Sequence, residues 1–269
     1  MIKSFFGSAV MAAFLVGNFG AFISPAQAVT ISSGDLIRGT TFSAVYYMGI
    51  DGMRYVFPNE KTYKTWYMDA SGNSDFSDVV MISDAELADI QLGGNVTYKP
   101  GVRMVKINSD AKVYFVTDGG VLRPIASEAA AKAMYGSDWN KDIDDVPDAF
   151  FGSYSLSTND VSESETSIIS SAFADTINED KSLLTPEDIG ITDDGYDPLD
   201  VTICVGQNVR FTNNDTAKHT ATSDDLTWGS GTLQAGDTFI RKFSEAGTVT
   251  FYDGYDSTNT GAIFVEDCE

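Results

Sequence analysis

The stretch VTFYDGYDSTNTGAIFVEDCE, residues 249–269, has the pattern of two short strands joined by a polar loop. Val249–Tyr252 combines β-branched and aromatic side chains, and Ala262–Val265 follows Gly261 with alternating bulky residues. Such runs, bounded by glycine and polar residues, are typical of β-strands. The stretch therefore predicts a closing β-hairpin whose loop, residues 253–260, carries mostly oxygen-bearing side chains.

The residues before this hairpin continue the β pattern. Residues 191–215, ITDDGYDPLDVTICVGQNVRFTNND, contain short apolar runs with a turn at Gly206, and further turns follow at Gly236 and Gly247. Many short strands with glycine turns favour a β-sandwich. We therefore expect an all-β Greek-key sandwich over residues 189–269.

The order of motifs in this region resembles that of a known family. G-x-x-V-x-F-x-N-x-D spans residues 206–215 and precedes His219. S-G-x-L-x-x-G-x-x-F, F-x-x-x-G-x-x-x-F-Y and G-x-I-x-V follow at residues 230–239, 243–252 and 261–265. Together they resemble the cupredoxins, the plastocyanin-like copper domains of exported electron-transfer proteins. The resemblance covers less than a third of the chain and implies a cupredoxin-like fold there.

The resemblance also implies where copper ligands would stand. In that family a His follows the N-x-D strand, and a Cys, a second His and usually a Met come from the final hairpin. His219 matches the first His, but Asp253 stands at the Cys position, Asp256 at the second His position, and no Met lies between Asp256 and Gly261. A blue copper centre needs a thiolate and two imidazoles, so we expect no copper here.

His219 is the single histidine of the chain, and two interpretations of its surroundings remain. With Asp253 and Asp256 it could hold a different divalent cation, because one imidazole and two carboxylates can form a facial set of ligands. Alternatively, His219 is a hydrogen-bonding loop residue with two solvated aspartates nearby, which is the interpretation we favour.

The N-terminus has the features of a secretory signal. Lys3 precedes an apolar run, residues 5–23, and Ser24–Ala28 ends in the small-x-small pattern of a signal peptidase site. We predict a signal peptide over residues 1–28, export of the chain, and no transmembrane segment after cleavage. The formal net charge of −22 argues against nucleic acid and anionic lipid as partners.

Cys204 and Cys268 are the two cysteines of the chain. In an exported protein, an isolated pair forms a disulfide more often than a metal site. We therefore predict that these residues are bridged.

Two similar units follow the predicted signal peptide. Residues 44–57 contain an aromatic run, an Asp-Gly turn and a second run, and residues 112–125 repeat these features 68 positions later. Asp-Gly between alternating runs predicts a hairpin, and Asn59 and Ser127, each followed by Glu, predict caps of short helices. We expect an α+β domain of two hairpin–helix repeats over residues 29–154.

These hairpins, with an Asp-Gly turn, an Arg and a capped helix, also resemble modules of secreted bacterial envelope proteins. The first copy departs from that spacing, because Arg54 follows Gly52 by only two positions. This resemblance implies location more than activity. Residues 155–188 then have almost no aromatic side chains and are rich in Ser, Thr and acidic residues, which predicts an acidic linker. Within it, Ile169, Phe173 and Ile177 have the i, i+4, i+8 spacing of a short helix.

Two acidic loops space oxygen atoms like the start of a calcium-binding loop. The first offers Asp69, Ser71, Asn73 and Asp75, and the second spans Asp138–Asp145. Both lack the closing Glu of such a loop. We expect polar surface loops, with calcium as the less favoured alternative.

Enzyme signatures such as G-x-S-x-G, H-E-x-x-H and phosphate-binding glycine loops are absent from the sequence, so we expect no catalysis. We predict a non-catalytic, exported cell-surface protein that acts in envelope assembly, adhesion or carbohydrate contact, including a surface layer. Its partners would be envelope polysaccharide, other surface proteins or further copies of itself. The alternative is a periplasmic or extracellular metal-binding or electron-transfer protein with an unconventional site.

Overall fold

The computed structural model describes residues 30–68, 74–165 and 174–268. The predicted signal peptide, residues 1–28, lies outside these ranges. Within them the chain is mostly β, with short helices between the strands. Contacts divide the chain into two units, Met1–Thr30 and Ile31–Glu269, so both predicted domains and the segment between them fall in the same unit. In the described part, no helix combines the length and the apolar character needed to cross a membrane.

The first sheet has five short strands in the order β4-β1-β2-β3-β5. They are β1 (Leu36–Arg38), β2 (Tyr46–Met48), β3 (Arg54–Val56), β4 (Val79–Met81) and β5 (Leu92–Asn95). The first three pair antiparallel, whereas β4 runs parallel to β1 and β5 runs parallel to β3. Helix α1 (Glu60–Tyr67) connects β3 to β4, and α2 (Asp84–Asp89) connects β4 to β5.

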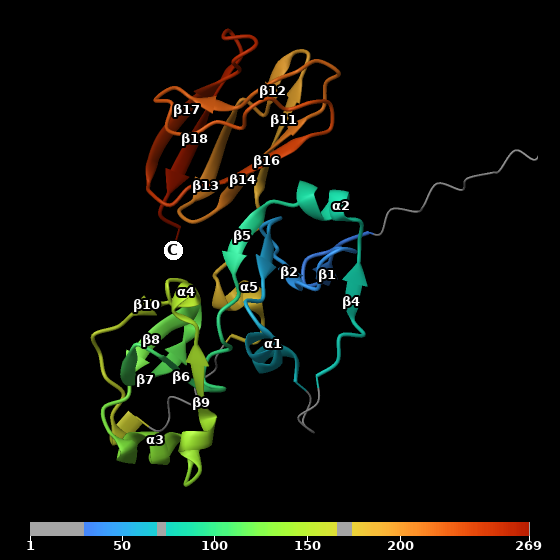
Figure 1. Cartoon of the computed structure of the whole chain (residues 1–269). Coiled ribbons are helices and arrows are strands. Elements are labelled where there is room, and N and C mark those ends of the chain that lie inside the picture. Colours follow the sequence, from blue (N-terminus) through green and yellow to red (C-terminus); the bar gives the residue numbers. More distant parts are fainter. Residues whose placement is uncertain (1–29, 69–73, 166–173, 269) are drawn as a thin grey trace, which may run out of the picture. The chain divides into compact units, whose positions relative to one another are not determined.

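The second sheet also has five strands, in the order β10-β8-β7-β6-β9. They are β6 (Met104–Ile107), β7 (Asp110–Thr117), β8 (Val121–Pro124), β9 (Ile143–Val146) and β10 (Ser155–Leu156). Its first three strands are antiparallel, with β9 parallel to β6 and β10 parallel to β8. Helices α3 (Glu128–Tyr135) and α4 (Asp148–Phe151) and the 3-10 turns η1 (Asp118–Gly120) and η2 (Trp139–Asp142) complete this part. The two sheets therefore have the same order of pairings along the chain (Figure 1).

Local chemistry explains the turns and helix starts in both sheets. Gly52 and Gly119, in the two hairpin turns, have φ angles of 82° and 72°, which glycine adopts without the steric cost that a Cβ adds. Asn59 begins α1 because its side chain accepts a hydrogen bond from the Thr62 amide at 2.9 Å. Ser127 begins α3 in the same way.

The segment expected as an acidic linker contains regular structure. It begins with β10, and Val161 forms an isolated parallel bridge with Ile125. Further on, α5 (Ile177–Asp180) starts with a capping box at Thr176. Ile177 is 1% exposed and belongs to the hydrophobic cluster of the first sheet. Residues around α5 are therefore packed against a core.

The C-terminal part forms two four-stranded sheets. One has the order β12-β11-β14-β16 and the other β13-β18-β17-β15. Their bounds are β11 (Glu187–Thr192), β12 (Gly195–Asp197), β13 (Asp200–Cys204), β14 (Asn208–Asn213), β15 (Thr222–Ser223), β16 (Thr238–Lys242), β17 (Gly247–Tyr252) and β18 (Thr260–Glu266). The predicted closing hairpin is confirmed, since β17 and β18 pair antiparallel. The β pattern thus begins at Glu187, two residues before the predicted boundary.

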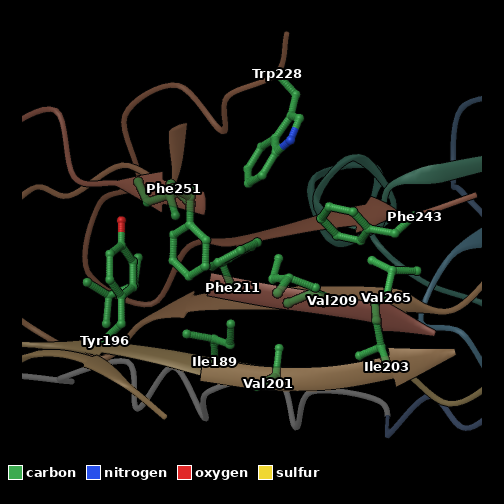
Figure 2. Packing of buried hydrophobic residues seen from close by; sticks show 14 residues of the cluster. Ile189, Tyr196, Val201, Ile203, Val209, Phe211, Trp228, Phe243, Phe251 and Val265 are labelled. Carbon is green, nitrogen blue, oxygen red and sulfur yellow. The ribbon is translucent and has the colours of Figure 1, made fainter. Parts of the chain in front are cut away.

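An aromatic cluster fills the space between these two sheets. Phe251 is fully buried, and its ring centroid lies 5.2 Å from that of Phe211 and 4.8 Å from that of Tyr196, both in edge-to-face geometry. Figure 2 shows the Phe211 and Phe251 rings close together, with aliphatic side chains such as Val201 and Val265 filling the rest of the cluster. Aromatic pairs in this geometry stabilise a core beyond their buried area.

A disulfide closes the sandwich. Cys204 ends β13, and Cys268 lies just beyond β18, which runs parallel to β13. Their Cα atoms are 5.4 Å apart, within the usual range for a bridged pair. The predicted Cys204–Cys268 bridge is therefore present.

Candidate functional site

The candidate site lies in loops that leave the ends of the sandwich strands. His219 follows β14 and precedes β15, and its backbone exchanges two hydrogen bonds with Leu233. Asn213, at the end of β14, donates its side-chain amide to the carbonyl oxygens of Ala217 and Leu233. These bonds hold the loop, and with it the imidazole, in one position.

Asp253 is the principal partner of His219. It follows β17 directly, and its side chain is 0% exposed. Its Oδ2 atom lies 2.6 Å from Nδ1 of His219, and its Oδ1 atom accepts from the backbone amides of Thr220 and Tyr255. The Asp253 carboxylate therefore ties the final hairpin to the His219 loop.

Asp215 holds the other side of the imidazole. Its Oδ2 atom lies 3.0 Å from Nε2 of His219. In the sequence this residue is recognisable only as the last position of the G-x-x-V-x-F-x-N-x-D motif. The signal that could have identified it is the Asp-x-x-x-His spacing inside one loop, which lets a chain reversal bring the two side chains together. We call Asp215, His219 and Asp253 the histidine clasp.

The two carboxylates favour the charged form of the imidazole. Burial opposes that charge, but the hydrogen bonds to Asp215 and Asp253 outweigh burial and raise the pKa of His219. The hydrogen bond with His219, together with hydrogen bonds from backbone amides, lowers the pKa of Asp215. A neutral imidazole has only one N–H to donate, whereas the protonated ring donates to both carboxylates.

Asp256 is not part of this cluster of hydrogen bonds. Its Oδ1 atom accepts from the amide and hydroxyl of Thr258, 3.0 Å and 2.7 Å away, and these bonds lower its pKa. The Asp256 carboxylate therefore forms hydrogen bonds within its own turn and not with His219. Of the predicted set His219, Asp253 and Asp256, the structure joins the first two directly and replaces the third by Asp215.

These residues do not fit a blue copper centre. They supply one imidazole and carboxylates, whereas such a centre needs a thiolate and two imidazoles. The two cysteine sulfur atoms of the chain are joined in the disulfide, and both nitrogens of His219 already face carboxylates. Across the described ranges, no group of three or more His, Cys, Asp or Glu residues is arranged to hold a metal ion.

The first calcium candidate is only partly visible in the structure. Asp69, Ser71 and Asn73 lie outside the described residues. Asp75 is described, and its Oδ1 atom accepts from the amide and hydroxyl of Ser77. This carboxylate is therefore engaged in a local turn.

The second acidic loop forms ion pairs with cationic side chains. Asp144 contacts Lys61 at 2.8 Å and Arg103 at 2.6 Å. Asp138 pairs with Lys141, and Asp145 pairs with Lys106. These carboxylates point to separate cations, so the loop does not gather them around one centre.

Comparisons with known proteins yield partial similarities. No family model matches the chain, and neither does any curated protein. The chain is similar to a purple cupredoxin from Nitrosopumilus maritimus, with 28% identity, 30% of this chain and 99% of that chain covered, and a TM-score of 0.29. The chain is also similar to a reduced tryptophan-to-tyrosine mutant of amicyanin, with 19% identity, 30% of this chain and 82% of that chain covered, and a TM-score of 0.29. The copper-containing nitrite reductase from Thermus scotoductus SA-01 has 17% identity, with 31% of this chain and 23% of that chain covered, and a TM-score of 0.29.

Proposed function

We propose that this chain is a non-catalytic, exported cell-surface protein that binds or organises envelope material through contacts with polysaccharide or other surface proteins. In this proposal, residues 29–154 are two copies of one envelope module. The sandwich is a cupredoxin-like domain in which the histidine clasp replaces a copper centre.

The observation that carries this proposal is the position of Asp253. Its buried carboxylate stands where the resemblance to cupredoxins would put the copper thiolate, and it makes a 2.6 Å contact with His219. Protein side chains thus complete the hydrogen bonding of the imidazole. This arrangement supports a domain that serves binding and structure and does not carry electrons.

The same geometry supports the absence of catalysis at this site. A general base needs a ring nitrogen that can reach a substrate proton. Both nitrogens of His219 are occupied by carboxylates, and the His219 side chain is 12% exposed. The clasp therefore acts as a structural link between two loops.

Copper titration of the purified full-length mature chain tests the sandwich part of the proposal. We expect a colourless protein after addition of Cu(II), because no thiolate is available for charge transfer. The His219→Ala variant should bind as little copper as the wild type. A blue absorption band, or one-to-one binding lost in His219→Ala, would establish an electron-transfer or metal-binding protein instead.

Fractionation of producing cells tests the location. We expect the chain to be cleaved after Ala28 and to sediment with the envelope fraction, which N-terminal sequencing and immunoblotting would detect. Recovery as a soluble monomer in the medium would contradict retention at the surface. Electron microscopy of the purified protein would show whether it forms a lattice.

A further inference from the structure

A groove beside α1 has the composition of a ligand site. Its volume is about 750 Å³, within the range of small-molecule pockets. Its lining includes residues of β1, of the start of α1 and of β4, together with Phe150 of α4. We call it the α1 groove, and the lining residues that matter below are Arg38, Ser43, Asn59, Glu60, Tyr63 and Phe76.

One side of the α1 groove presents a column of aromatic rings. Phe76 stacks on Tyr63 with ring centroids 4.7 Å apart and an interplanar angle of 24°. Tyr63 in turn stacks on Tyr67 at 5.2 Å and 28°. Phe76 is 47% exposed, whereas Tyr63 is 2% exposed. The outer ring of the column is therefore available to a ligand.

The aromatic platform is held in place before any ligand arrives. The Tyr63 hydroxyl donates to the carbonyl oxygen of Asp75 at 2.9 Å. The Asp75 carboxylate then accepts from Ser77. These bonds fix the backbone on both sides of Phe76, so a ligand would meet a preorganised ring at little entropic cost.

Four other aromatic rings of the first sheet and α1 are less suitable platforms. Tyr47 and Tyr55 are buried, with 3% and 6% exposure. Arg54 lies over the ring of Tyr46, and Lys99 lies over the ring of Trp66. Phe76 is therefore more accessible for stacking than these four rings, and Phe42, which is 75% exposed, does not line the α1 groove.

Several hydrogen-bond donors around the α1 groove have no partner among residues 30–68, 74–165 and 174–268. Asn59 uses its Oδ1 atom to cap α1, and its Nδ2 atom has no partner in the described ranges. The same holds for the hydroxyl of Ser43 and for the guanidinium of Arg38. Arg38 can only donate, and it matches a carboxylate in bidentate geometry.

The charges around the α1 groove limit the class of ligand that it can bind. Glu60 is paired with Lys64 at 2.7 Å, which leaves Arg38 as a cation without a counterion among the described residues. Asp75 and Asp78 lie near Tyr63 and contribute to the rise of its pKa, after burial. Such acidic neighbours would repel a dense polyanion, so a ligand with isolated carboxylates fits better.

We propose that the α1 groove binds a pyranose residue that carries a carboxylate, as part of an acidic polysaccharide. The apolar face of the sugar ring stacks on Phe76, the carboxylate pairs with Arg38, and sugar oxygens accept from Asn59 and Ser43. This inference rests on the proposed function, in which the chain contacts envelope polysaccharide, and it specifies the site and the sugar class.

Calorimetric titration of the full-length mature chain with methyl galactopyranosiduronate, a single pyranose with one carboxylate, tests the site. We expect saturable binding, and weaker binding of its methyl ester, which has the same ring without the charge. Arg38→Gln and Phe76→Leu should each weaken binding about tenfold, roughly the loss of one charge-assisted or stacking contact. Phe76→Tyr should retain it because the ring remains.

Matched variants outside the groove serve as controls. Lys112→Gln removes an exposed cation, and Tyr255→Ala removes a ring that is 57% exposed. Both should bind like the wild type, and melting curves should show that all variants are folded. Absence of saturable binding, equal affinity in Arg38→Gln and Phe76→Leu, or preference for an apolar peptide over the sugar would overturn the proposal.

Envelope association separates this proposal from the broader one. If the wild type sediments with envelopes and Arg38→Gln and Phe76→Leu sediment equally well, the α1 groove is not the glycan site although the surface role stands. If the wild type does not associate with envelopes at all, the surface role itself fails.

Discussion

The histidine clasp concentrates three ionisable groups at one point of the sandwich. Asp215 and Asp253 approach opposite nitrogens of His219, and Thr220 and Tyr255 complete the bonding of Asp253. The attraction is strongest when the imidazole is charged. The stability of the sandwich should therefore depend on the protonation of this one ring.

The raised pKa of His219 predicts a pH dependence of stability. A His whose pKa is higher in the folded state stabilises the fold fully below its unfolded pKa of about 6.5. This contribution disappears as pH rises through the folded pKa. Denaturant unfolding of the wild type should therefore show a falling free energy of unfolding above pH 6.5. The His219→Gln variant should lack this fall, and equal pH profiles would contradict the prediction.

Asp180 predicts a second pH dependence at lower pH. Burial raises the pKa of Asp180 to about 6, although the amide of Gly119 and the hydroxyl of Thr97 donate to its carboxylate. Its pKa in the unfolded chain is about 3.9. Between about pH 4 and pH 6 the folded state therefore keeps a proton on Asp180 that the unfolded chain has released. The free energy of unfolding should fall as pH rises from about 4 to 6, by on the order of 2–3 kcal/mol.

Asp180→Asn tests this assignment. The amide keeps an acceptor for Gly119 without a buried charge, so this variant should be more stable than the wild type at pH 7.5 and similar at pH 4. The free energies of unfolding of both proteins, measured with urea at pH 4 and pH 7.5, test this expectation. A variant less stable than the wild type at pH 7.5 would show that the charge is needed.

At the scale of elements, the hairpin of β17 and β18 depends on a close approach at Gly261. This residue pairs with Phe251 across the hairpin. A Cβ atom at Gly261 would meet the carbonyl oxygen of Leu199 and would lie 2.5 Å from the Phe251 ring. Glycine is therefore required here by space, because Phe251 fills the centre of the core.

Gly261→Ala should destabilise the sandwich by about 1–3 kcal/mol, the usual cost of overpacking. Denaturant unfolding monitored by tryptophan fluorescence would measure it. Gly229→Ala is the control, since the nearest atom to its Cβ is 3.4 Å away. The prediction fails if the two variants lose the same small amount of stability.

The elements show how far sequence can predict this chain. The β17–β18 hairpin followed from local alternation and glycine positions, and so did the cap at Asn59. The parallel partners β4 and β5 did not follow, because strands of three or four residues carry little pattern and pair across long separations. The order of strands in a sheet is a tertiary property.

The site was predictable to a similar extent. Motif order identified His219 and Asp253 as neighbours, but it could not separate Asp253 from Asp256. Each is followed two residues later by a donor, Tyr255 or Thr258. What orients Asp253 inward is the amide of Thr220 in another loop, and such a contact leaves no local signature in sequence.

At the scale of the whole molecule, the disulfide should be a large single contribution to stability. It joins residues 64 positions apart. Closing a loop of this length in the unfolded chain contributes about 4 kcal/mol in the chain-entropy model. The double variant Cys204→Ser with Cys268→Ser should lose roughly that much, as measured by guanidinium unfolding.

Reduction of the wild type with dithiothreitol provides an independent check. The reduced wild type and the double variant should unfold at the same denaturant concentration, because both lack the covalent bond. An unchanged midpoint after full reduction would contradict the prediction.

The same bridge determines how the chain would carry a mechanical load. Cys204 and Cys268 connect parallel neighbours β13 and β18, so tension applied to the chain on either side passes through the sulfur atoms. All of β14 to β18 lies inside the covalent loop and is shielded from the pull. With an extended length of about 3.5 Å per residue, reduction would release on the order of 200 Å of hidden chain. Oxidation state therefore sets how far this protein can be stretched.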